Sequence, residues 1–265
     1  MAGSMVYRLR VGAPNNPHMQ RFRRAMAKIQ AIRDKRGYNH IAGFHGEPNW
    51  YCWHHQRNQK NPRVRARLLL PWHRAYLWWL EQALQDAMKV EADGVALPWW
   101  DWTTQRGVPE AYAAETVGGE HNPLFDSHIR VSGATPVDRF TTRDPGSPSG
   151  LPSAARVERL LSQTHFSTFS DGLESIHDSV HGWIGGDMES LEYAAFDPIF
   201  FAHHSMIDRL WYVWQVRHGV RNIPPGLLDM ELIPFGKRVG DVLDVESLGY
   251  EYAASATEIS LGATT

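Results

Sequence analysis

The sequence contains a single cysteine, Cys52, so a framework of disulfides within one chain is excluded. It also lacks any run of about 20 apolar residues, the length that a helix needs to cross a bilayer, and we expect no membrane association. Neither sign of charge is in excess, since 27 Lys and Arg face 29 Asp and Glu. This balance does not favour nucleic acid or an anionic surface as a partner.

The N-terminus, MAGSMVYRLRVGAPNNPHMQ, lacks the apolar core of a secretory signal peptide. We therefore expect a cytoplasmic protein, unless a presequence has been lost or a partner accompanies the chain in secretion. The 265 residues contain no internal repeat and no visible domain boundary. Because 43% hydrophobic and 21% charged residues are typical of globular proteins, residues 1–265 are expected to form one domain.

The sequence is rich in histidine and tryptophan, with 14 and 11 residues, which raises the expectation of a metal site inside an aromatic core. Asn16 and Pro17 suit the start of a helix, and apolar residues then recur at spacings of 3, 4 and 3. Helical patterns cover residues 17–36, 71–88, 175–184 and 198–218, the last ending at Gly219. Long loops and short strand-like pieces such as RVGDVLDV (238–245) connect them. We predict a mainly α fold whose four-helix core points histidines inward.

Two groups of histidines could each form a metal site. His177 and His181 are four residues apart, on one face of a helix, and His204 on the next helix could complete a trio. The second group is His45, His54, His55 and His73. Imidazole suits copper, zinc, iron or nickel, and an all-histidine site holds both oxidation states of copper, as redox chemistry with dioxygen requires.

Several known classes of metal site fit these residues poorly. An isolated pair of histidines four residues apart is more often a coincidence than a ligand pair. The zinc-protease motif is excluded, because it needs Glu directly after the first histidine, where Asp178 stands. Glu174 and His177 form a Glu-x-x-His motif, yet a di-iron bundle needs two and the sequence has one. A structural zinc site usually includes thiolates, which a single cysteine does not favour.

Three blocks of the sequence resemble the type-3 copper proteins, which are the tyrosinases, catechol oxidases and hemocyanins. They are LLLPWHRAYLWWLEQAL (68–84), GLESIHDSVHGWIGGDM (172–188) and FDPIFFAHHSMIDRLWYVWQ (196–215). PWWDWT (98–103) is also similar to the family, as is YEY (250–252), which marks the end of its catalytic domain. The resemblance implies a four-helix core that holds a dinuclear copper site.

The resemblance implies two copper ions per chain and a set of six ligands. These are His45, His54, His73, His177, His181 and His204. His203 is then a neighbour of the site, and Cys52 is expected to form a thioether with His54. Residues 56–67 look like a polar, basic insertion between His54 and His73, and it leaves His55 as an alternative to His54.

The resemblance also assigns roles near the metals. Glu174 and Asp178 occupy positions at which relatives order a water, and together they could take the proton of a phenol, although acidic residues early in a helix also favour its dipole. Leu191 corresponds to a gate residue, and Gly182 leaves room for substrate. Asp208 either accepts a hydrogen bond from a ligand ring or pairs with an arginine.

The implied function is that of a bacterial-type tyrosinase or polyphenol oxidase, with small phenols and O₂ as substrates and melanin biosynthesis as the associated pathway. Such an enzyme hydroxylates monophenols at the ortho position and oxidises o-diphenols to o-quinones. The alternatives are a catechol or o-aminophenol oxidase and a hemocyanin-like oxygen carrier. Because 13 residues follow Tyr252, we expect no C-terminal shielding domain. A copper-delivery partner is one way in which the site would be loaded.

Overall fold

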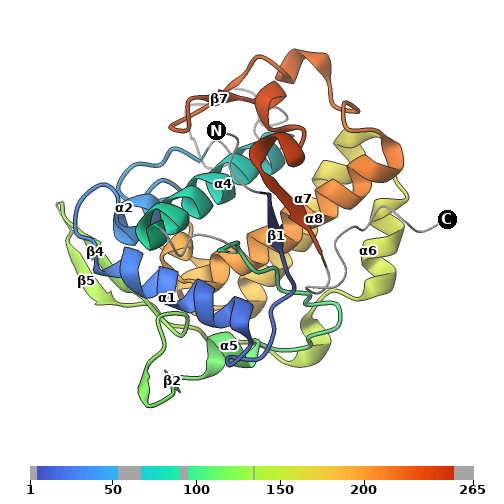
Figure 1. Ribbon diagram of the computed structural model, residues 1–265. Helices are drawn as coiled ribbons and strands as arrows, with labels where there is room; N and C mark the ends of the chain where they lie inside the picture. The colour runs from blue at the N-terminus through green and yellow to red at the C-terminus, as the bar shows by residue number, and fades with distance from the viewer. Residues whose placement is uncertain (1–4, 53–66, 90–94, 134, 254–265) are drawn as a thin grey trace.

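The computed structural model describes residues 5–52, 67–89, 95–133 and 135–253, and it shows a helical core with short strand pairs around it (Figure 1). The four long helices are α1 (Pro17–Ala31), α4 (Leu69–Met88), α7 (Phe166–Ile184) and α8 (Ile199–His218). The shorter α-helices are α2 (Tyr38–Ala42), α5 (Glu110–Ala113) and α6 (Ala154–Leu161). The predicted mainly α fold with a four-helix core is confirmed. Among these residues, no helix is both long enough and apolar enough to span a bilayer.

The helix ends show how far local sequence decides the fold. Asn16 caps α1 through a hydrogen bond from the His18 N–H to its side chain, as predicted. Helix α8 ends at Gly219, whose φ of 99° is a conformation that favours glycine. Helix α7, by contrast, begins at Phe166 rather than near residue 175. Its first turns bury Phe166 and Phe169, an apolar stripe that the prediction missed.

Short 3₁₀ turns close the loops around the core: η3 (Pro148–Gly150), η4 (Gly186–Glu189), η5 (Ala194–Phe196), η6 (Pro225–Leu227), η7 (Val239–Val242) and η8 (Glu246–Leu248). The predicted strand in residues 238–245 is wrong beyond its first residue, because β7 ends at Arg238 and η7 follows. The Arg238 N–H donates to the Asp241 side chain at 2.7 Å, a local contact that favours a turn over an extended strand.

The strands occur in pairs. The antiparallel pairs are β2 (Thr116–Val117) with β3 (Glu120–His121), β4 (His128–Val131) with β5 (Val137–Phe140), and β6 (Glu231–Leu232) with β7 (Lys237–Arg238). The fourth pair is parallel and joins the two ends of the described chain, β1 (Val6–Arg8) with β8 (Tyr250–Tyr252). Figure 1 shows this pair lying across the helical core.

The core is strongly aromatic, as the tryptophan content suggested. Six tryptophans are among the largest fully buried side chains: Trp72, Trp99, Trp100, Trp102, Trp211 and Trp214. Phe200 and Phe201 of α8 are also completely buried, as expected for core packing. Trp211 and Trp214 of α8 pack against Phe166 and Phe169 of α7, and Trp72 packs against His73 on α4, so aromatic rings exclude water beside the histidine-bearing helices.

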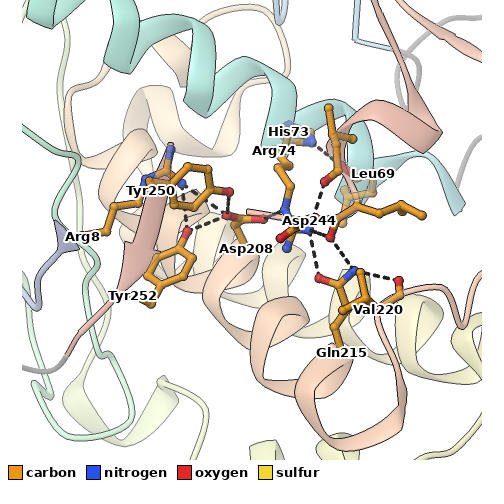
Figure 2. A network of polar contacts seen from close by, with 12 residues as sticks. Arg8, Leu69, His73, Arg74, Asp208, Gln215, Val220, Asp244, Tyr250 and Tyr252 are labelled. Carbon is orange, nitrogen blue, oxygen red and sulfur yellow. Dashed lines mark hydrogen bonds and ion pairs between the residues drawn. The ribbon is translucent and has the colours of Figure 1, made fainter. Parts of the chain in front are cut away.

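A buried network of charges ties the β1–β8 pair to the helices (Figure 2). The Arg8 guanidinium donates to both Glu81 oxygens, at 3.0 and 3.1 Å, and to Asp208 at 3.2 Å. Asp208 also accepts the hydroxyls of Tyr250 and Tyr252 at 2.7 and 2.6 Å. The two chain ends are therefore fastened to α4 and α8 through ionic and hydroxyl groups that are all buried.

Arg74 completes this network from α4. Its Nε donates to Asp208 at 2.5 Å, and its Nη1 donates to the Gln215 side chain at 2.9 Å and to the Leu243 carbonyl at 3.0 Å. The guanidinium also lies over the Trp211 ring, 3.7 Å from its centroid. Of the two roles that the sequence left open for Asp208, the structure shows the ion pair with arginine.

Candidate metal centre

Three histidine rings from α7 and α8 converge on one point. The His204 Nε2 atom lies 3.2 Å from the Nε2 of His177 and 3.1 Å from the Nε2 of His181. His177 and His204 are buried, and His181 is partly exposed. The structure brings the two histidines four residues apart together with His204, as the helical spacing predicted, and their role as ligands stays a prediction.

Hydrogen bonds at the opposite ring atoms fix the orientation of two of these rings. The Nδ1 of His181 lies 2.7 Å from the Met188 carbonyl, and the Nδ1 of His177 lies 2.9 Å from the Asp178 carboxylate. A carbonyl or a carboxylate can only accept a hydrogen bond, so Nδ1 carries the proton in both rings. In the neutral tautomer each Nε2 then presents a lone pair to the centre.

These lone pairs make the group fit a metal ion. The Nε2 lone pairs of His177 and His181 converge on the Nε2 of His204, and imidazole nitrogens about 3 Å apart are spaced so that one cation can bind between them. Burial, and then the neighbouring histidines, lower the pKa of His204 well below its ordinary value, so the imidazole stays neutral, which is its ligand form. Neutral imidazoles suit copper, zinc, iron or nickel.

The second group lies beside α4. Single side-chain donor atoms of His45, Cys52 and His73 lie within 4.8 Å of one another, and all three residues are buried. The His73 Nδ1 is 2.8 Å from the Leu69 carbonyl, one turn earlier, so Nδ1 carries the proton and Nε2 is the ring atom with the lone pair. His54 lies outside the described residues, so the thioether with Cys52 stays a prediction.

The two groups face a common centre. The rings of His73 and His204 are stacked, with centroids 4.2 Å apart, and His73 lies 6.1 Å from His177. His45 lies 6.4 Å from His204, and Phe200 packs between them, 4.9 Å and 4.0 Å from the two rings. Five of the six predicted ligands are thus described, and all five are brought together.

His203 is also part of the first group, since its donor atom lies within the same 4.8 Å limit. Its ring stacks on His177 with centroids 5.4 Å apart, and burial lowers its pKa well below the ordinary value. Both ring nitrogens are buried and have no hydrogen-bond partner among the described residues. The short Nε2 contacts go to His204, which agrees with the prediction that His203 is a neighbour.

A cavity of about 380 Å³ opens over the centre. His45, His177 and His181 line it, and Leu191 at its edge is 52% exposed. Gly182 also lines the cavity, and a Cβ atom added there would meet no atom within 4 Å. Both residues predicted to control substrate access therefore lie at this opening.

The two predicted acidic residues differ in position. Asp178 lines the cavity and its side chain is 62% exposed, while it contacts the His177 ring. Glu174 is half-buried one helical turn earlier on α7 and is not among the residues that line the cavity. Of the two carboxylates, Asp178 is the one that faces the opening.

The sequence did not reveal the wall opposite α7. The loop after His45 contacts residues 191–192, since the Glu47 N–H donates to the Glu192 carbonyl at 3.1 Å. A Cβ atom on Gly46 would lie 2.3 Å from the same carbonyl, so this contact requires glycine. Gly46, in the FHG stretch (44–46), was the one feature of the sequence that could have indicated this contact. Met188 and Glu189, which also line the cavity, carry no motif.

Comparisons of sequence agree with this geometry. The family model described as "Common central domain of tyrosinase" matches residues 35–148 and 136–217. Hemocyanin 1 of Megathura crenulata is 33% identical over 242 residues, which are 83% of this chain and 7% of that protein. The hemocyanin beta-C chain unit D of Helix pomatia is 34% identical over 203 residues, 73% of this chain and 48% of its own length. This chain spans less than two thirds of such curated relatives.

Solved structures with the same fold include hemocyanins and tyrosinases. A functional unit of octopus hemocyanin superposes with a TM-score of 0.76 at 28% identity, covering 93% of this chain and 68% of that one. A tyrosinase from Burkholderia thailandensis superposes with a TM-score of 0.75 at 22% identity, covering 97% and 76%, a likeness that concerns the fold alone. With the family model matched over most of the chain and the histidine groups in place, the chain belongs to the tyrosinase family of type-3 copper proteins.

Proposed function

We propose that this protein is a phenol oxidase that uses dioxygen at two copper ions per chain, hydroxylating monophenols at the ortho position and oxidising o-diphenols to o-quinones. The observation that carries the proposal is the cavity of about 380 Å³, with imidazoles of both histidine groups at or beside its floor and an open mouth. A site that only has to admit dioxygen needs no cavity of this size, whereas an aromatic ring does.

The chain's own residues would hold the metals. His177, His181 and His204 offer one set of Nε2 atoms, and His45 and His73, with His54 as the predicted third member, offer the second. Bound copper supplies one-electron redox changes and a site for dioxygen. The rings of His73, His177 and His181 are oriented in advance by hydrogen bonds at their Nδ1 atoms, which would keep these ligands in place during electron transfer.

The phenolic proton needs an acceptor, because a phenol has a pKa of about 10. Asp178 is placed for this task, since its carboxylate is exposed to the cavity and also holds the His177 ring. Glu174 lies one turn away on the same helix and assists by holding water near Asp178. Gly182 and Leu191 leave the space through which a flat ring enters.

A reversible oxygen carrier is the second candidate, and the hemocyanin relatives favour it. A carrier would bind dioxygen without consuming it when a catechol is present. A catechol or o-aminophenol oxidase would consume dioxygen with an o-diphenol but not with a monophenol.

One experiment separates these functions. The copper-loaded protein is assayed for metal content and for dioxygen consumption with 4-ethylphenol and with 4-ethylcatechol. We expect two copper ions per chain and consumption with both substrates, and we expect His204→Ala to lose copper and activity. His121→Ala, which changes a histidine outside the centre, is the control and should keep both. A single bound metal, or a preference for zinc, would contradict the proposal.

A further inference from the structure

The opening of the cavity carries negative charge. Among the described residues that line it, Asp178 and Glu189 are acidic and none is Lys or Arg. Among the described residues, a charged group on a substrate would therefore meet two carboxylates and no cationic Lys or Arg side chain at the mouth.

Glu189 is exposed and lines the cavity from an anchored turn. It ends η4 and directly follows Met188, whose carbonyl lies 2.7 Å from the His181 Nδ1. The preceding Asp187 is buried and receives two hydrogen bonds from Arg139, at 2.6 and 2.8 Å. The exposed Glu189 carboxylate thus projects from an anchored turn, one residue away from the carbonyl that orients a floor imidazole.

The arginine that contacts this turn is already paired. Arg139 donates to both Asp187 oxygens and, at 3.0 Å, to the Phe140 carbonyl, and the Thr142 N–H adds a third hydrogen bond to the Asp187 carboxylate at 2.8 Å. This pair satisfies its own charges, so Arg139 does little to neutralise Glu189. Asp178, on the opposite wall, adds a second negative group to the mouth.

These positions give the cavity two ends of different character. A phenol that directs its hydroxyl oxygen to the imidazole floor places its para substituent at the mouth, beside Glu189. We propose that Glu189 makes the site selective for phenols with a cationic para side chain, the phenylalkylamines, over phenols that carry a carboxylate there. The inference rests on the proposed function, because it assumes that a phenol is the substrate.

The test compares tyramine, 4-ethylphenol and 3-(4-hydroxyphenyl)propionate, which share a ring and differ in side-chain charge. We expect kcat/KM to fall in that order. A charge at a partly exposed site changes kcat/KM of a charged substrate by about threefold. Glu189→Gln should therefore lower the ratio of kcat/KM for tyramine to kcat/KM for 3-(4-hydroxyphenyl)propionate by about tenfold. Glu189→Lys should reverse the order, and added salt should compress it.

Glu120→Gln is the matched control. Glu120 is exposed on the β2–β3 hairpin, away from the cavity, and this substitution changes the net charge of the protein by the same amount as Glu189→Gln. It should keep the wild-type ratio. If Glu120→Gln lowered the ratio of kcat/KM for the cationic and anionic phenols as much as Glu189→Gln does, the net charge of the protein, and not the mouth of the cavity, would set the substrate preference.

A binding measurement keeps the inference separate from the proposed function. Tyramine and 3-(4-hydroxyphenyl)propionate are titrated into the copper-free protein and followed by ligand-observed NMR, in wild type and in Glu189→Gln. If 4-ethylphenol is not oxidised by the copper-loaded protein, the proposed function fails, while a preference for tyramine that depends on Glu189 still supports the charged mouth. Equal binding and turnover of cation and anion in the wild type, or a preference unaffected by Glu189→Gln, overturns it.

Discussion

His73 and Arg74 are neighbours on α4, and His204 and Asp208 are one turn apart on α8, so the metal centre and the ion-pair network lie side by side in the same two helices. The network satisfies itself: Arg8 and Arg74 balance Glu81 and Asp208, and two tyrosine hydroxyls donate to Asp208. Among the described residues, the metal centre holds no charged side chain of its own, and its Nε2 atoms converge at 3.1–3.2 Å.

The difference shows what each buried polar cluster is for. A network in which each charge has a partner contributes to a single, well-defined packing of the helices and the chain ends. A cluster of buried imidazoles with converging nitrogens can take up a cation, and the packing around it holds the rings in place. The network joins α4 to α8, the helices that also carry His73 and His204.

Removing one partner from the network should have the largest effect. Arg74→Met leaves Asp208 without its closest ion pair, at 2.5 Å, inside the protein. Breaking a buried pair in this way costs about 3–5 kcal/mol of the free energy of unfolding. Urea denaturation of the copper-free protein measures it.

Arg217→Met is the control for that measurement, because it breaks the Arg217–Glu158 pair, whose side chains are 40% and 63% exposed. An exposed pair is worth about 0–1 kcal/mol. If Arg74→Met cost no more than this control, the network would not be what fixes the two helices.

The two clusters also differ in how far the sequence predicted them. The spacing of His177 and His181 is local and follows from the helical period, and the block around His204 resembles a known family. The contact between Arg8 and Asp208 joins residues 200 positions apart. A lone arginine in a short strand has no periodic pattern, so nothing in the sequence indicated that Arg8 would be buried.

The cavity shows the same limit. Leu191 and Gly182 could be placed at the mouth through the resemblance, and the structure agrees. The role of Met188 could not be predicted, because it depends on the direction of a backbone carbonyl and not on a side chain. The contact between the loop after His45 and the Glu192 carbonyl is likewise a backbone contact, and its only signal in the sequence was Gly46.

His18 is a buried histidine that belongs neither to the ion-pair network nor to the metal centre. His18 is 4% exposed, and its Nε2 has no hydrogen-bond partner among the described residues. Burial, and then Arg21, lower the pKa of His18 from 6.5 to about 4. The unfolded chain therefore binds a proton first as the pH falls, so stability is complete above about pH 6.5 and is lost progressively between pH 6.5 and 4.

At pH 5 the proton uptake at His18 should lower the free energy of unfolding by about 2 kcal/mol, because pH 5 is about 1.5 units below the pKa of this histidine in the unfolded chain. His18→Met removes the titrating group, so its free energy of unfolding should fall less than that of wild type between pH 7.5 and pH 5. Denaturation curves at the two pH values measure the difference. Equal losses in His18→Met and wild type would contradict the assignment.

The smallest effect concerns the link between a metal ligand and its orienting group. Asp178 accepts a hydrogen bond from the His177 Nδ1 at 2.9 Å, which holds the tautomer whose Nε2 faces the centre. Asp178→Ala should weaken copper binding by about tenfold, as is usual when such a partner is removed, with no comparable change in the stability of the copper-free protein. Competition with a copper chelator measures the affinity.

Two further variants separate the hydrogen bond from the charge. Asp178→Asn keeps an oxygen that can accept from Nδ1, so it should retain most of the affinity lost in Asp178→Ala. Asp171→Ala removes the same charge from an exposed position on α7 about two turns earlier and should bind copper as the wild type does. If Asn and Ala at position 178 weakened copper equally, the carboxylate would act through its charge, and the orientation of His177 would depend on the packing of its ring against His203 and His204.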